Sequence, residues 1–151
     1  MIPDYQINDL TRLFKQNAHG ENALRMAQYM KGHFLFFGIK STMRRELQRE
    51  WWRGRSIQSE NELQSIIEAL RDLDEREYQY VGLDLGKRYK KLFAPNSIAF
   101  IQKLVITKSW WDTVDAMASH FAGAVVFNNP ETGKVMDGWI DHENMWMRRT
   151  A

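Results

Sequence analysis

Apolar residues recur at helical spacing from the beginning of the chain. In residues 4–17 they stand at Ile7, Leu10, Leu13 and Phe14, close to the i, i+3, i+4, i+7 pattern of an amphipathic helix. The same period continues downstream and predicts a succession of further helices. We expect these to open at Gly20, Ser41, Ser59, Asp74, Asn96 and Ser109, and a later one to pass through Met136, Trp139 and Ile140.

Glycine, proline and small polar residues mark where these helices begin and end. Gly54 is expected to end the third helix and Asp74 to cap the fifth. Pro95 suits the first turn of the sixth. Ser109, with Asp112 three residues later, has the spacing of a capping box at the start of the seventh helix.

Two apolar runs depart from the helical period. Residues 34–39 predict a buried connection between helices. Residues 122–127 are the best candidate for a strand, although they can equally complete the seventh helix. Since no series of strands is visible, the pattern predicts an all-α protein.

The spacing of the helices suggests a repeat. From Asp74 to Ser109 is 35 residues, and from Ser109 to Asn144 is 35 again, with a helix pair in each interval. This is the spacing of HEAT or armadillo-like repeats, which stack antiparallel helix pairs into an α-solenoid. No residue signature recurs at this period, so an irregular helical bundle remains the alternative. We expect residues 1–151 to form a single domain.

The last residues have the pattern of the start of a helix. Asn144 has the character of an N-cap, and residues 145–151 fit the first two turns. No later helix is present to pack on Trp146, and a solenoid needs its last repeat covered. We therefore expect the repeat domain to be incomplete at its C-terminus.

Composition places the chain among ordinary globular proteins. Its 151 residues are 44% apolar and 26% charged, enough for one domain with a substantial core. The absence of cysteine excludes disulfides, thiolate metal sites and a cysteine nucleophile. No apolar stretch is long enough to span a bilayer, and the first residues do not resemble a signal peptide. We expect a cytoplasmic monomer with no membrane association.

The positions of the basic residues say more about a possible partner than the net charge does. The formal net charge is only +2 and the isoelectric point is about 8.9. Basic residues nevertheless gather in short clusters, at Arg44, Arg45, Arg49, Arg53, Arg55, Lys87, Arg88, Lys90, Lys91, Arg148 and Arg149. Such clusters can follow phosphates if they share one face. Solvated helix surfaces are the alternative interpretation.

The segment of residues 107–115 carries the most informative pattern. Trp110, Val114, Met117 and Phe121 form one helical stripe, which predicts core, whereas Trp111 and Asp115 are neighbours on another face. A large aromatic ring beside a carboxylate suits a cationic ligand. The alternative is that Trp111 packs on the next repeat and Asp115 is solvated.

Residues 108–115, Lys-Ser-Trp-Trp-Asp-Thr-Val-Asp, resemble the signature of the AlkD-type DNA alkylation repair family. Other stretches agree with that family in order and spacing, and the similarity extends over essentially the whole chain. They are residues 26–31, followed by 37–40 and Arg44-Arg45, then residues 75–80, then residues 143–149.

The resemblance implies a fold and a set of site residues. The fold is a superhelix of HEAT-like helix pairs with a concave, basic face for duplex DNA. The family's catalytic aspartate falls on Asp115, and its lesion-contacting residues fall on Trp111, Arg149 and Tyr29. We take as DNA-backbone candidates Lys40, Arg44, Arg45, Lys108 and Arg148. A further lesion-enclosing tryptophan of the family lies beyond the matched segment.

The implied activity is a DNA glycosylase that hydrolyses the N-glycosidic bond of cationic N3- or N7-alkylated purines in duplex DNA. Such a purine is a good leaving group, so the enzyme mainly needs a negative charge near C1′ and a positioned water, which Asp115 can supply. The resemblance implies that the lesion stays exposed and the enzyme grips the backbone. No cofactor is expected. The alternative is a non-catalytic HEAT-like scaffold that binds DNA or protein.

Three other groups of residues carry weaker signals. The histidines have no metal-ligand spacing, so no metal site is expected. Glu75, Arg76 and Glu77 fit a salt-bridged helix surface better than a pair of catalytic acids. Trp51 and Trp52 fit a packed helix end better than a platform for base stacking.

Overall fold

The computed structural model describes residues 4–151, with side chains described from Gln6 onward, and it is helical throughout. Within this part of the chain the only pairing of β type is an isolated parallel bridge between Leu35 and Glu75. The protein is therefore all-α, as the periodicity predicts.

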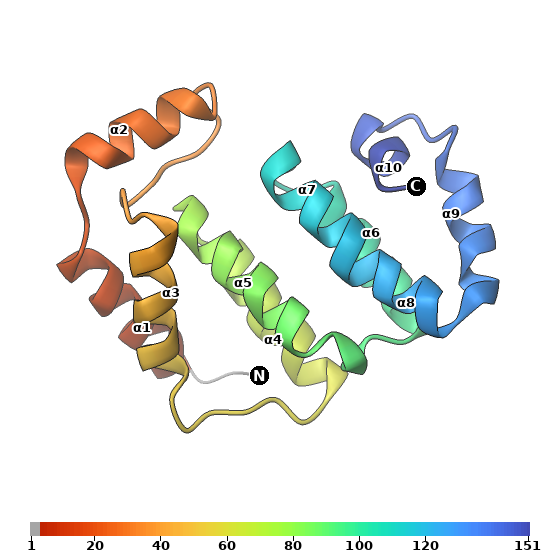
Figure 1. Cartoon of the computed structure of the whole chain (residues 1–151), viewed down its shortest axis with the longest axis horizontal. Helices are drawn as coiled ribbons and strands as arrows, with labels where there is room; N and C mark the ends of the chain where they lie inside the picture. Colours follow the sequence, from red (N-terminus) through yellow and green to blue (C-terminus); the bar gives the residue numbers. More distant parts are fainter. Residues whose placement is uncertain (1–3) are drawn as a thin grey trace. The chain divides into compact units, whose positions relative to one another are not determined.

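α-Helices follow one another along the chain (Figure 1), and short helical turns join them in its second half. The α-helices are α1 (Asp4–Gln16), α2 (Gly20–Tyr29), α3 (Ser41–Trp52), α4 (Glu60–Arg71), α5 (Arg76–Arg88), α6 (Ile98–Val105), α7 (Trp111–Met117), α8 (Gly123–Asn128), α9 (Gly133–Trp139) and α10 (Met145–Thr150). The shorter turns are the 3-10 segments η1 (Lys90–Leu92), η2 (Pro95–Ser97) and η4 (Pro130–Thr132), and the π-helical turn η3 (Ala118–Ala122).

The chain divides into two compact units, one up to Gly82 and one from Leu83 to Ala151. The boundary lies inside α5, so the beginning of that helix belongs to the first unit and its end to the second.

In the first unit, α1 packs against α3. Its centre is filled by apolar side chains of α1 and α4, among them Leu10, Phe14, Leu63 and Ile66, which are all fully buried. Trp51 and Trp52 at the end of α3 are also buried, which confirms their assignment as a packed helix end.

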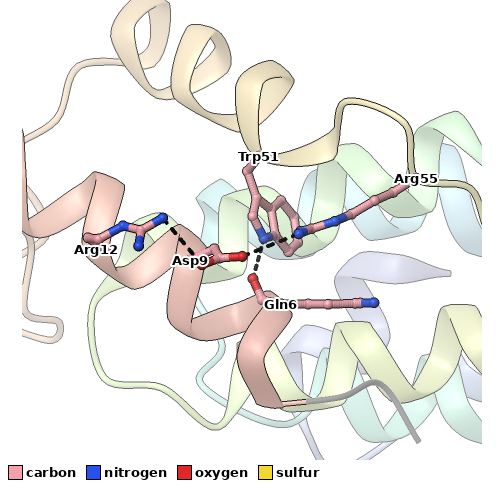
Figure 2. Close-up of polar contacts among 5 residues, drawn as sticks. All are labelled: Gln6, Asp9, Arg12, Trp51 and Arg55. Atoms are coloured by element: carbon pink, nitrogen blue, oxygen red, sulfur yellow. Dashed lines mark hydrogen bonds and ion pairs between the residues drawn. The ribbon is translucent and has the colours of Figure 1, made fainter.

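Polar contacts tie α1 to the end of α3 (Figure 2). The Asp9 carboxylate accepts hydrogen bonds from Arg12 at 3.3 Å and from Arg55 at 3.4 Å. The Trp51 indole N–H donates to the Gln6 carbonyl, and the Arg55 guanidinium lies over the Trp51 ring. Arg55, expected only as part of a basic cluster, therefore has a structural role.

In the second unit, α10 packs against α6, α7 and α9. The core includes Ile101 of α6, Val114 and Met117 of α7, and Met147 of α10, all fully buried. Phe121 is also buried, so Val114, Met117 and Phe121 form the buried part of the predicted apolar stripe, whereas its first member, Trp110, is only half-buried.

The start of the helix after Ser109 differs from the prediction. Trp110 is the N-cap of α7 and makes no side-chain cap bond. Ser109 instead donates its hydroxyl hydrogen to the carbonyl of Val105 in the preceding helix, so it ends one helix and does not cap the next.

The end of this helix also departs from ideal α geometry. At η3 the Gly123 N–H donates to the Ala118 carbonyl, a π-type bond that adds one residue to the turn. The extra residue rotates the next turn of the helix, and Ala122 is buried instead of extending the face of Trp111 and Asp115. Residues 123–128 form α8, so the strand alternative for residues 122–127 is wrong.

The connection between α2 and α3 is only partly buried. Ile39 is inside, as predicted, but Leu35 is 63% exposed. The helix expected from Asp74 begins at Arg76, whose N–H donates to the Leu35 carbonyl at 2.8 Å. Helix α3 begins at Ser41, as expected, and Lys40 is its N-cap.

Candidate functional site

Asp115 of α7 and Arg149 of α10 form a two-bond ion pair within the second unit. The Arg149 Nε–H donates to Oδ1 of Asp115 at 2.6 Å, and Nη2 donates to Oδ2 at 2.8 Å. The side chains are 49% and 48% exposed, respectively, so the pair lies open to solvent. Side-by-side bonding of this kind fixes the orientation of both groups.

The position of Arg149 follows from how α10 is anchored. Asn144 caps the helix by accepting the Trp146 N–H at 2.9 Å, as the sequence predicts. Met147 is buried in the core, and the Trp146 ring lies 5.7 Å from the ring of Trp110. Trp146 thus packs at the start of α7, although the sequence indicates no partner for it. These contacts turn Arg149 toward Asp115.

Trp111 begins α7 one helical turn before Asp115 and is 40% exposed. Val114 and Met117 face the core from the other side of the helix. The aromatic ring and the carboxylate therefore emerge on one open face, as their i, i+4 spacing predicts.

The ion pair controls the charge of the carboxyl group. The hydrogen bonds from Arg149 are the main reason that the pKa of Asp115 lies below its usual value; burial opposes them, and the Arg149 charge lowers the pKa by a smaller amount. The same hydrogen bonds raise the pKa of Arg149, because they favour the charged form of both partners. The site therefore presents an ionised carboxylate at neutral pH. The guanidinium has five N–H donors, so the pair leaves some of them for another anion.

Tyr29, the other residue expected to contact the lesion, ends α2 in the first unit and is 71% exposed. Lys40 and Arg45, at the start of α3, are exposed, whereas Lys108 is half-buried with a backbone φ of 48°. Arg148 is exposed, and its Nη1 donates to the carbonyls of His142 and Glu143 just before α10. Each of these residues has some surface for a ligand.

Arg44 does not fit its expected place among the backbone contacts. It is buried, it donates from Nη1 to Gln48 Oε1 at 2.8 Å, and its guanidinium lies 5.4 Å from the centre of the Tyr80 ring. Helix α3 turns Arg44 inward and the adjacent Arg45 outward. Burial therefore removes Arg44 from the candidate phosphate contacts.

The comparisons with known proteins bear on the whole chain. The sequence model of the family described as DNA alkylation repair enzyme matches residues 10–151. The chain belongs to this family. A solved structure described as a predicted DNA alkylation repair enzyme from Enterococcus faecalis is 32% identical, with a TM-score of 0.79. The match covers 89% of the present chain and 63% of that one, so the present chain spans less than two thirds of that structure's length. None of the curated proteins compared matches the present chain.

The sequence pattern misplaced the residues at the start of α5. Arg76 and Glu77 are not helix surface, because their side chains are 0% and 1% exposed. The Arg76 guanidinium lies 3.6 Å from the centre of the Phe34 ring. The Glu77 carboxylate accepts three backbone N–H groups, from Phe37 at 3.0 Å, Gly38 at 2.9 Å and Ile39 at 3.1 Å. The only sequence signal was that both residues precede the apolar stripe of Tyr78, Val81 and Leu85.

His120 lies in the π turn after Asp115 and is half-buried. Burial, followed by the charges of Lys87 and Lys90, lowers its pKa below the usual histidine value. The ring is therefore neutral at pH 7.

The described part of the chain offers neither a metal cluster nor a membrane span. Residues 4–151 include no group of three or more histidine, cysteine, aspartate or glutamate side chains placed to hold a metal ion. Over the same residues, no helix has the length and apolar character needed to cross a membrane.

Proposed function

We propose that this chain carries the catalytic face of a DNA glycosylase that removes cationic N3- or N7-alkylated purines from duplex DNA. The observation that supports this most directly is the half-exposed Asp115 carboxylate, which two hydrogen bonds from Arg149 hold in a fixed orientation and whose pKa they lower. Membership of the DNA alkylation repair enzyme family supports the same proposal at a coarser level.

The proposed reaction breaks the bond between C1′ and the purine nitrogen. The bonding electrons move into the alkylpurine ring and neutralise its positive charge, so no general acid has to protonate the leaving base. The sugar develops positive charge, which the Asp115 carboxylate stabilises by electrostatic attraction. A water held by this carboxylate adds to C1′ and gives its proton to the carboxylate, which passes it on to solvent. The products are an abasic sugar and a free neutral base.

In this proposal Arg149 has two partners. In the free protein its donors hold Asp115 in place. A DNA phosphate would compete for the same guanidinium through charge-assisted hydrogen bonds. Binding of the backbone would then loosen the hold on the carboxylate at the moment when the lesion arrives, and direct it to the sugar.

Trp111 would contact the lesion nucleotide from one turn away. Its exposed indole can attract a cationic nucleotide through cation–π interaction, which favours the alkylated over the normal base. Since the face is open, we propose that the lesion is handled without an enclosed base pocket. Selectivity then comes from the charge and lability of the lesion itself.

One observation favours a second candidate function. Because Arg149 occupies both oxygens of Asp115, the pair is also suited to hold α7 to α10 in a non-catalytic scaffold that binds DNA or protein. In that case the carboxylate has no chemical role.

The experiment that tests the proposal is release of 7-methylguanine from methylated duplex DNA. We expect the chain to release the base and Asp115→Asn to slow release roughly 100- to 1000-fold. Asp137→Asn is the matched control, since it removes an exposed carboxylate from α9 of the same unit. Circular dichroism at the assay temperature checks that all forms are folded. If Asp115→Asn releases base as fast as the control, Asp115 is not catalytic; if no form releases base but all bind DNA, the scaffold function replaces the proposal.

A further inference from the structure

Helix α2 contributes no residue to the core of the first unit. None of its residues is buried, and Leu24 and Tyr29 are 69% and 71% exposed. Figure 1 shows α2 set apart from α1 and α3. A ten-residue helix is too short to be stable by itself in water, so contacts at its ends must hold it in place.

The contacts at the start of α2 are made with the segment of residues 37–39. The His19 N–H, at the N-cap, donates to the Phe37 carbonyl at 2.9 Å. Gly38 has a backbone φ of +90° and lies directly against this helix end. A Cβ at Gly38 would fall 2.0 Å from the His19 carbonyl oxygen and 2.6 Å from the Ala23 nitrogen. The two backbones therefore meet at a junction that admits only glycine.

The other side of this segment is held by Glu77. Its two carboxylate oxygens accept the N–H groups of three successive residues, Phe37, Gly38 and Ile39, and the carboxylate is almost fully buried. Backbone bonds to a charged, buried acceptor are among the stronger hydrogen bonds in proteins. Glu77 thus fixes the one segment on which the start of α2 rests.

We propose that Glu77 is a positioning residue for DNA recognition: through residues 37–39 it fixes helix α2, and so the place at which α2 presents Tyr29 to DNA. This rests on the proposed function and on the role near the lesion that the family resemblance implies for Tyr29. Glu77 itself is buried and does not touch DNA. Its effect reaches Tyr29 through the junction of Gly38 with His19 and Ala23.

Other contacts keep the segment near the core when Glu77 is changed. The Phe37 ring lies 5.7 Å from Phe14 and 5.5 Å from Tyr78. Glu77→Gln has nearly the same shape as the native side chain, but an amide has a single oxygen to accept these bonds, and its NH2 group would face at least one of the three N–H donors. We therefore expect a folded protein with a loosened junction and not an unfolded one.

The first measurement is hydrogen exchange of the backbone amides of residues 37–39. Glu77→Gln should speed their exchange roughly 10- to 100-fold, the range expected for loss of a hydrogen bond to a charged group. Glu75→Gln is the matched control. It removes the same charge two residues earlier, just before α5, from a side chain that is only half-buried. Unchanged exchange in Glu77→Gln would overturn the anchoring role.

The second measurement is a double-mutant cycle on affinity for duplex DNA, made with Glu77→Gln and Tyr29→Ala. We expect Glu77→Gln to weaken binding several-fold in the native background and to have no further effect once Tyr29 is absent. Equal losses in both backgrounds would show that Glu77 acts by another route and would overturn the proposal. Gly38→Ala disturbs the junction where residues 37–39 meet the start of α2. It should likewise weaken DNA binding in the native background and have no further effect once Tyr29 is absent.

Neither measurement depends on base excision. Failure of the glycosylase proposal would appear as absence of 7-methylguanine release by the native chain. Failure of the positioning role would appear as unchanged amide exchange, or as additive effects in the cycle. If the native chain also excises, Glu77→Gln should raise KM and leave kcat nearly unchanged, because the catalytic carboxylate of Asp115 is not altered.

Discussion

At the scale of single residues, the hydrogen bonds from Arg149 keep the Asp115 carboxyl charged at lower pH than an ordinary aspartate. A depressed pKa means that the charged form persists as pH falls through the usual aspartate value of about 4. Any step that needs this carboxylate should therefore keep its rate down to a lower pH than a free aspartate would allow.

Arg149→Gln should move this acid limit upward. Without the guanidinium, the pKa of Asp115 returns toward its ordinary value, because the main cause of the shift has been removed. We expect the acid limb of the excision rate, corrected for spontaneous base loss, to shift to higher pH. The carboxyl carbon shift of Asp115, followed by NMR, should titrate in parallel. An unchanged titration in the variant would show that the carboxyl is controlled by something other than Arg149.

At the scale of elements, the π turn η3 is built into the packing of the second unit. It directs the Phe121 ring against Gly86 near the end of α5, where a Cβ would fall 2.2 Å from the ring. The same ring lies 5.0 Å from that of Phe93. The Phe121 ring therefore occupies the space that a side chain at position 86 would need, and the π turn places it there.

Gly86→Ala should destabilise the protein by roughly 1–3 kcal/mol, the usual cost of overpacking a tight core. Gly138→Ala is the matched control, since position 138 lies in α9 with nothing within 4 Å of an added Cβ. There the change should be neutral or stabilising, because alanine favours a helix. Thermal or urea unfolding measures both. Phe121→Leu should recover part of the loss caused by Gly86→Ala; destabilisation by Gly138→Ala of the same size would contradict the explanation.

At the scale of the whole molecule, a formal net charge of +2 does not distinguish a DNA-binding protein from many others. What matters is which basic side chains are available. Arg44 and Arg45 are adjacent in sequence, yet Arg44 is buried over Tyr80 and Arg45 is exposed.

The two arginines should therefore respond in opposite ways. Arg45→Gln is expected to weaken binding to undamaged duplex DNA and to reduce the slope of log affinity against log salt by about 0.9, the value for one phosphate contact. Its Tm should stay nearly constant. Arg44→Gln should lower stability by roughly 1–3 kcal/mol and leave the salt slope unchanged. Fluorescence anisotropy at several salt concentrations provides the slopes. A larger decrease of the salt slope in Arg44→Gln than in Arg45→Gln would reverse our assignment of the two residues.

Local patterns predicted a good part of this protein. The period of apolar residues located the helices, the stripe of Val114, Met117 and Phe121 is buried as expected, and Asn144 caps α10. These features depend on residues within a few turns of one another. For the same reason the i, i+4 spacing placed Trp111 and Asp115 on one face.

The errors share a physical cause. Periodicity tells which face of a helix is apolar but not what a polar residue meets in space. Glu77 was predicted to be surface because its partners, the N–H groups of residues 37–39, lie about forty positions earlier. Ser109 was predicted to be a cap because its alternative acceptor, the Val105 carbonyl, belongs to the preceding helix.

The sequence by itself determined the helical class, the positions of most helices, the family resemblance and the residues of the candidate site, because these depend on local spacing and motif. Only the tertiary structure decided that Arg149 bonds both oxygens of Asp115, that Arg44 is buried, and that Glu77 holds the segment beneath α2. These contacts depend on how helices distant in sequence pack, which is set by the summed burial of many side chains.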